Sequence, residues 1–125
     1  MVFLDTNILL EIILKNRSKC SQVENFLQTL TEYTAISMLS VHLIMYFGRK
    51  EQVSDDFLES IIKENTIFPI SPEDYNWALS NEKGKDFEDA LQIAVAIRSG
   101  SRTFVTLDRA LVKSYSAMPI RIITI

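Results

Sequence analysis

Short apolar runs recur along the chain, and one or two segments of helical periodicity separate each run from the next. The runs fall at 1–4, 33–36, 66–70, 103–106 and 120–125. None of them alternates cleanly between apolar and polar residues, so each strand should be covered on both faces, and helical connections are what parallel strands require. The pattern predicts an α/β fold in which helical layers cover a central parallel sheet of four to five strands.

The segments between these runs carry the marks of helices. Residues 21–24 have the pattern of a capping box, and the Ser-Pro pair at 71–72 is typical of a helix start. A helix over 86–99 is expected to end at the following glycine. The stretch 37–46 is apolar nearly all round, which predicts a helix buried on several sides, and we expect part of it to form a homodimer interface.

The length fits a single domain, residues 1–125, which at this size buries roughly two-thirds of the surface of its unfolded chain. Cys20 is the only cysteine, so no internal disulfide can form, which fits a reducing compartment. No apolar run approaches the roughly eighteen residues of a membrane helix. Acidic and polar residues interrupt the first apolar stretch, which argues against a signal peptide. We therefore expect a soluble cytoplasmic protein with no membrane partner.

The balance of charge argues weakly against nucleic acid as a partner. Thirteen Lys and Arg stand against sixteen Asp and Glu, giving a net charge of -3, whereas domains that bind nucleic acid through their overall field are usually basic. A site in which carboxylates bind metal adds negative charge that bound cations offset. The net charge therefore does not exclude a metal-dependent nuclease.

Acidic and polar residues follow the expected strands directly. Asp5, Ser37 and Asp108 stand where three strands end, and in an open parallel sheet this is the edge where ligands bind. Asp86 and Asp89 lie three residues apart at a helix start, so they share one face of that helix. The carboxylates should therefore reach a single cleft.

Carboxylates that converge in this way suit a hard cation. Mg²⁺ takes oxygen ligands and is commonly held by one or two carboxylates together with waters and phosphate oxygens of the substrate. An alternative explanation applies to each acid separately, because Asp86 or Asp89 could cap a helix, and Asp5 and Asp108 each precede one. The shared sheet edge favours the metal site.

Four ordered segments resemble the motifs of PIN domains, and the resemblance covers the whole chain. They are FLDTNILL at 3–10, ISMLSVHL at 36–43, DFEDALQ at 86–92 and VTLD at 105–108. The segment at 86–92 and the helix that carries His42 most resemble the subgroup of VapC-type toxins. PIN domains are metal-dependent ribonucleases of three-layer α/β/α fold, and many are toxins that an antitoxin protein holds inactive.

The resemblance implies a role for each acid. Asp5, Asp89 and Asp108 match the acids of the family that bind Mg²⁺ or Mn²⁺ and would be the catalytic residues. Their polar neighbours are expected to support them, and these are Asn7, Thr106, Asp86 and Ser37. The implied activity is hydrolysis of RNA phosphodiesters by metal-activated water.

One position departs from the family pattern. The family usually has a glutamate in the helix after Ser37, and the aligned position here is Leu43. Substitutes are hard to find, because His42 lies about a hundred degrees away on the helix and imidazole suits Mg²⁺ poorly. Glu11 lies one turn beyond Asn7 but is expected to be an exposed charge, and Glu88 is expected to point elsewhere on its helix.

Two hypotheses from different classes follow. The first is a PIN-type endoribonuclease, a toxin with an antitoxin partner; the second is a PIN-like binding or assembly module that has lost catalysis through Leu43. A phosphorelay receiver is disfavoured, because Asp5 stands alone where receivers have paired acids and Arg121 is the only basic residue of the last strand. A phosphatase of the Asp-x-Asp type is disfavoured too, because Asn7 occupies the second acidic position.

Overall fold

A five-stranded parallel sheet forms the centre of the computed structural model, which describes residues 1–84 and 86–125. The strand order is β3-β2-β1-β4-β5, and every neighbouring pair is parallel. The strands are β1 (Val2–Leu4), β2 (Thr34–Ser37), β3 (Thr66–Phe68), β4 (Thr103–Thr106) and β5 (Arg121–Thr124). The predicted α/β fold with a parallel sheet is confirmed, at the upper end of the expected strand number.

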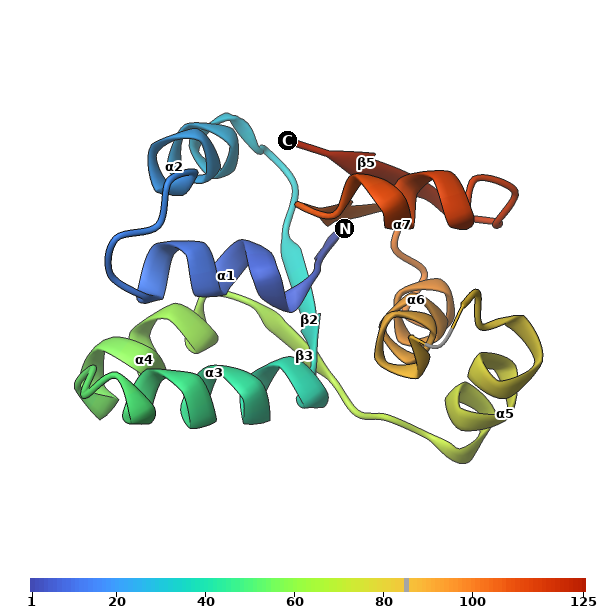
Figure 1. Ribbon diagram of the computed structural model, residues 1–125, viewed down its shortest axis with the longest axis horizontal. Coiled ribbons are helices and arrows are strands. Elements are labelled where there is room, and N and C mark those ends of the chain that lie inside the picture. Colours follow the sequence, from blue (N-terminus) through green and yellow to red (C-terminus); the bar gives the residue numbers. More distant parts are fainter. Residues whose placement is uncertain (85) are drawn as a thin grey trace.

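Helices connect the strands and cover both faces of the sheet (Figure 1). In the described part of the chain they are α1 (Thr6–Ile13), α2 (Cys20–Thr29), α3 (Met38–Lys50), α4 (Asp55–Lys63), α5 (Pro72–Asn81), α6 (Phe87–Arg98) and α7 (Arg109–Ser114). Helices α1 to α4 lie on one side, and α5 to α7 lie on the other. The molecule therefore has the three layers expected of an α/β/α fold.

Two hydrophobic cores lie on opposite faces of the sheet, because successive strand residues point to opposite sides. Val2 and Leu4 belong to the core under α1 to α4, whereas Phe3 between them belongs to the core under α5 to α7. Phe3 stacks on Phe104 of the neighbouring strand, with ring centroids 5.8 Å apart. Strand β1 is apolar throughout because both of its faces are buried.

The start of α2 differs from the prediction. The helix begins at Cys20, and no side chain caps it, so the capping box predicted at 21–24 is wrong. The buried Glu11 carboxylate reaches this turn instead, and its Oε1 accepts a hydrogen bond of 2.7 Å from the backbone N–H of Lys19. Glu11 is therefore not the exposed helix charge that its position suggested.

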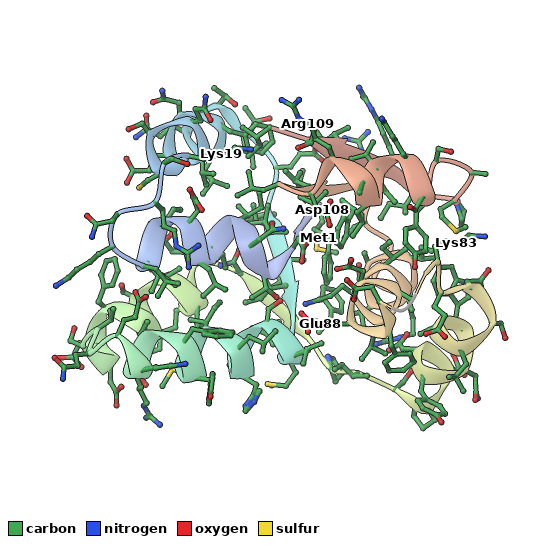
Figure 2. The ribbon with its side chains drawn as sticks, viewed as in Figure 1. Met1, Lys19, Lys83, Glu88, Asp108 and Arg109 are labelled. Carbon is green, nitrogen blue, oxygen red and sulfur yellow. The ribbon has the colours of Figure 1, made fainter. Side chains whose placement is uncertain are left out.

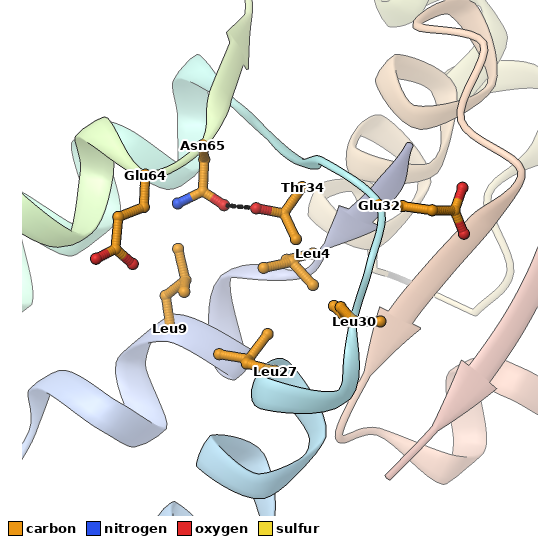
Figure 3. Close-up of a pocket in the computed structure, with 8 residues that line it drawn as sticks. All are labelled: Leu4, Leu9, Leu27, Leu30, Glu32, Thr34, Glu64 and Asn65. Atoms are coloured by element: carbon orange, nitrogen blue, oxygen red, sulfur yellow. Dashed lines mark hydrogen bonds between the residues drawn. The ribbon is translucent and has the colours of Figure 1, made fainter.

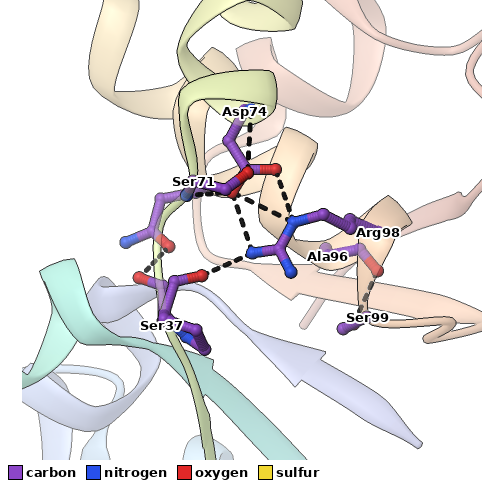
Figure 4. A network of polar contacts seen from close by, with 8 residues as sticks. Ser37, Ser71, Asp74, Ala96, Arg98 and Ser99 are labelled. Atoms are coloured by element: carbon purple, nitrogen blue, oxygen red, sulfur yellow. Dashed lines mark hydrogen bonds and ion pairs between the residues drawn. The ribbon is translucent and has the colours of Figure 1, made fainter.

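The start of α5 agrees with the prediction. The Ser71 side chain accepts from Asp74 N, and Asp74 Oδ2 accepts from Ser71 N at 2.8 Å, which completes a capping box. Arg98 of α6 donates to both oxygens of Asp74 and to the carbonyl of Pro69, so the cap also ties α5 to α6 (Figure 4). Within residues 1–84 and 86–125, none of the helices has the length and hydropathy needed to cross a lipid bilayer.

Candidate metal centre

The candidate site lies at the carboxyl edge of the two central strands. Strands β1 and β4 pair directly, and the ladder continues one step further because Asp5 N donates to Val105 O at 2.9 Å. Asp5 therefore leaves β1 beside the last residues of β4, shortly before Asp108. Ser37 ends β2 on the other side of β1. The topology brings the predicted residues to one sheet edge.

Asp5 is buried, and hydroxyl and amide groups fix its carboxylate. Thr106 Oγ1 donates to Asp5 Oδ2 at 2.8 Å and accepts from Asn7 Nδ2 at 3.2 Å. The other end of the Asn7 amide accepts from Leu107 N at 3.1 Å. Thr106 and Asn7 therefore hold Asp5 in one orientation, which is the supporting position expected of both residues.

Asp86 and Asp108 both cap helices. Asp86 Oδ1 accepts from Asp89 N at 3.1 Å at the start of α6. Asp108 Oδ1 accepts from Ala110 N at 2.9 Å and from Leu111 N at 3.3 Å at the start of α7. Both side chains are exposed, so the capping explanation applies to these two acids.

A cavity of about 290 Å³ lies at this sheet edge, and two of the three predicted metal-binding acids line it. Asp5 and Asp89 line it together, and Leu43 lies in the same wall, as the alignment through Ser37 indicates. Asp108 is not among the lining residues. The full lining is Asp5, Thr6, Asn7, Leu10, Leu43, Phe47, Glu88 and Asp89.

Glu88 is the lining acid that the sequence did not predict. It was expected to point away from the site, yet it lies on the cavity wall, between α6 and the start of α3 (Figure 2). The first turn of α6 thus directs both Glu88 and Asp89 to the cavity. The only sequence signal was the acidic run of 86–89, which Phe87 alone interrupts.

The three acids that line the cavity all have a raised pKa, chiefly because they are partly or fully buried and secondly because other acids lie nearby. Burial raises the pKa of Asp5 to about 6 against the hydrogen bond from Thr106, and the charges of Glu88 and Asp108 raise it further. Burial also raises the pKa of Asp89, helped by the Asp86 side chain and by the charge on Asp5. The pKa of Glu88 is raised by burial and by Asp86. A nearby cation would relieve this repulsion.

Two further residues lie away from the cavity. His42 is exposed, and its ring stacks on Tyr46 with centroids 6.4 Å apart. The Glu11 carboxylate accepts a hydrogen bond from Lys19 N at the start of α2 and does not face the cavity. Neither therefore replaces the acid expected at Leu43.

A second cavity, of about 160 Å³, lies at the start of β2, where Thr34 lines it. It shares no lining residue with the candidate site. Four leucines and four polar residues line it, and among the polar ones Thr34 Oγ1 donates to Asn65 Oδ1 at 2.6 Å (Figure 3). Glu32 and Glu64 are its acids. Neither residue was singled out from the sequence.

The donor set of the first cavity fits a hard divalent cation. In the part of the chain that the structure describes, no three His, Cys, Asp or Glu side chains stand assembled around a common metal position. Asp5 and Asp89 nevertheless offer carboxylate oxygens to one space, and Mg²⁺ is commonly held by one or two carboxylates plus water and phosphate oxygens. The site therefore fits Mg²⁺ or Mn²⁺ through this pair.

Solved structures with the same fold include toxins. A toxin–antitoxin complex from Klebsiella pneumoniae is 19% identical, with a TM-score of 0.77 over 99% of this chain and 97% of that one. FitAcB from Neisseria gonorrhoeae is 24% identical, with a TM-score of 0.72 over 98% and 96%. VapC20 from Mycobacterium tuberculosis, a sarcin–ricin loop cleaving toxin, is 11% identical, with a TM-score of 0.73 over 97% and 99%. At these identities the likeness shows the fold alone.

Comparison of sequences identifies the family. No curated protein matches the sequence. The family model described as PIN domain matches residues 1–110, which include all the acids of the candidate site. The ordered motifs, the parallel sheet and the family model agree, and the chain belongs to the PIN domain family.

Proposed function

We propose that the protein is a metal-dependent endoribonuclease and the toxin of a toxin–antitoxin pair. The observation that carries the proposal is the pair of carboxylates, Asp5 and Asp89, that two different elements direct into one cavity at the sheet edge. Membership of the PIN domain family supports the reaction class. Asp108 does not line the cavity, but it is proposed as the third ligand because its charge raises the pKa of both Asp5 and Asp89.

Each group of the site has a part in this proposal. Thr106 and Asn7 orient the Asp5 carboxylate, and Asp86 fixes the first turn of α6 so that Asp89 faces the cavity. Mg²⁺ or Mn²⁺ bound there would lower the pKa of a coordinated water and offset charge on the scissile phosphate. Leu10, Leu43 and Phe47 form an apolar wall that keeps water from one side of the carboxylates.

The proposal extends to partners and location. A similar structure comes from a toxin–antitoxin complex of Klebsiella pneumoniae, which supports an antitoxin protein as partner. RNA is the proposed substrate and the cytoplasm the proposed location. A homodimer is proposed through the exposed side chains of α3.

A second function has its own support. Leu43 places an apolar side chain in the cavity where PIN domains usually have an acid, and Asp86 and Asp108 are already engaged as helix caps. A PIN domain that binds a partner and no longer cleaves RNA would have this site. Metal binding separates the two functions, because a module without affinity for the cation at millimolar concentration cannot use it for hydrolysis.

The experiment compares the wild type with Asp5→Asn and with Asp56→Asn, an exposed aspartate of α4 outside the cavity. Purified protein with Mn²⁺ is expected to cleave RNA, Asp5→Asn to lose that cleavage, and Asp56→Asn to retain it. Mn²⁺ should also raise the melting temperature of the wild type and of Asp56→Asn, but not that of Asp5→Asn. Cleavage that survives in Asp5→Asn would exclude the proposed role of this carboxylate.

A further inference from the structure

A buried polar network joins α1, α3 and α6 at the cavity. Gln92 of α6 is 1% exposed, and its Nε2 donates to Thr6 Oγ1 and to Ser40 Oγ, both at 2.9 Å. Its Oε1 accepts from Ser37 Oγ at 2.7 Å. The hydroxyls of Thr6 and Ser40 lie 2.7 Å apart and share a hydrogen bond. One side-chain amide therefore bonds to the first turn of α1 and to the cap and first turn of α3.

The network is fully bonded. Ser37 Oγ also accepts from Ser40 N at 3.2 Å, which caps α3. Among the described residues, no buried side-chain nitrogen or oxygen lacks a partner. A buried amide with all its bonds made has one favoured position, because leaving any of these groups unpaired costs free energy. Gln92 therefore fixes distances between helices more strictly than an apolar side chain would.

The network reaches the cavity itself, because Thr6 is one of the lining residues. Thr6 follows Asp5 directly, and Gln92 lies three residues after Asp89 and hence on the same face of α6. Helix α6 packs chiefly against α5, on the far side from α1. Asp5 and Asp89 carry like charges when ionised, and their repulsion acts to separate α1 from α6. The Gln92 amide opposes that separation.

We propose that Gln92 is a positioning residue: by tying α6 to α1 and α3, it sets the separation of the Asp5 and Asp89 carboxylates. The proposal rests on the function proposed above, since this separation has a chemical use only where the two carboxylates share a cation. Residues that orient metal ligands affect metal affinity without touching the metal. The expected signature is therefore a change in affinity for the cation that loss of stability does not explain.

The test uses Gln92→Met, which keeps the length of the side chain and removes its amide. Thr34→Val is the matched control, because it removes the hydrogen bond to Asn65 at the opposite end of β2 and away from the acids. Calorimetry gives the dissociation constant for Mn²⁺ of each protein, and crystal structures give the Asp5–Asp89 separation. We expect Gln92→Met to bind Mn²⁺ about tenfold more weakly, and Thr34→Val to stay within about twofold of the wild type.

The outcomes separate this proposal from the proposed function. If wild type and Gln92→Met bind Mn²⁺ equally, or the Asp5–Asp89 separation is the same in both structures, the positioning role is overturned. If the wild type itself binds no Mn²⁺ at millimolar concentration, the proposed function fails, and the crystal structures alone decide whether Gln92 sets the separation. Should Gln92→Met not fold, Ser40→Ala removes the two bonds that the Ser40 hydroxyl makes with Gln92 and Thr6, and an unchanged dissociation constant there would overturn the proposal.

Discussion

At the scale of single residues, the strands and helices around the cavity determine which side chains point into it. Asp5 has no freedom to point elsewhere, because Thr106 bonds its carboxylate and the backbone of β4 bonds its N–H. Asp5, Asn7 and Thr106 were predictable, since strand ends fix where such residues lie. The directions of the Glu88 and Glu11 side chains could not be predicted from the sequence. They depend on how the helices pack against one another and against the connecting loops.

Leu43→Glu tests the residue that departs from the family pattern. The new carboxylate would face Asp5 and Asp89 across the cavity, so we expect Mn²⁺ to bind about tenfold more tightly and RNA cleavage to rise. His42→Glu is the control, because it adds the same charge one residue away on the exposed side of α3. The measurement is calorimetry with Mn²⁺ on both variants. Equal affinities in the two would show that Leu43 does not limit the site.

At the scale of elements, α5 and α6 are tied together by an ion pair between a buried carboxylate and a partly exposed guanidinium. Asp74 is 2% exposed, and Arg98 pairs with it at 2.8 Å while the capping box holds its other bonds (Figure 4). Burial alone would raise the pKa of Asp74, but the hydrogen bonds from Arg98 and Ser71 outweigh it, so the pKa is lowered. The capping box at Ser71 was readable from the sequence because its residues are local. The pairing of Asp74 with Arg98 could not be read from the sequence, because the two residues lie on different helices.

Asp74→Asn is expected to lower the free energy of unfolding by about 2 kcal/mol at neutral pH, since it weakens the charge-assisted hydrogen bonds that the Asp74 carboxylate accepts from Arg98 and Ser71. Because the pKa of Asp74 is lower in the folded than in the unfolded protein, its ionised carboxylate stabilises the fold at pH values above the unfolded-state pKa of about 4. This stabilisation is lost as the pH falls through the pKa that Asp74 has in the folded protein. The difference between wild type and variant should therefore shrink below about pH 4. Urea unfolding at several pH values measures it.

Asp55→Asn is the control for that measurement. It breaks the Arg49–Asp55 pair, whose side chains are both more than half exposed, so its loss of unfolding free energy should be clearly smaller than that of Asp74→Asn. If Asp74→Asn and Asp55→Asn lost the same free energy of unfolding at neutral pH, Asp74 would not stabilise the fold more than an exposed ion pair does.

At the scale of the whole molecule, α3 divides its residues between the cavity and the surface. Leu43 and Phe47 line the cavity, whereas Met38 and Tyr46 are about half exposed at helical spacing on another side. The sequence predicted a helix apolar nearly all round but could not tell which side stays uncovered. An uncovered apolar face of this kind favours association between copies of the chain.

Tyr46→Arg is therefore expected to shift the protein from dimer to monomer in light scattering after gel filtration. Tyr33→Arg is the control, because Tyr33 is 84% exposed and lies just before β2 rather than on α3. A wild type that stays monomeric at all concentrations, or a dimer that both substitutions leave intact, would contradict an interface through α3.

The central claim is that Asp5 and Asp89 hold a divalent cation between them. Crystals soaked in millimolar Mn²⁺ test it most directly, because manganese is located by its own anomalous scattering. We predict an anomalous peak in the cavity, within about 2.5 Å of a carboxylate oxygen of Asp5 and of Asp89. A cavity without a peak in crystals that bind Mn²⁺ elsewhere would contradict the claim.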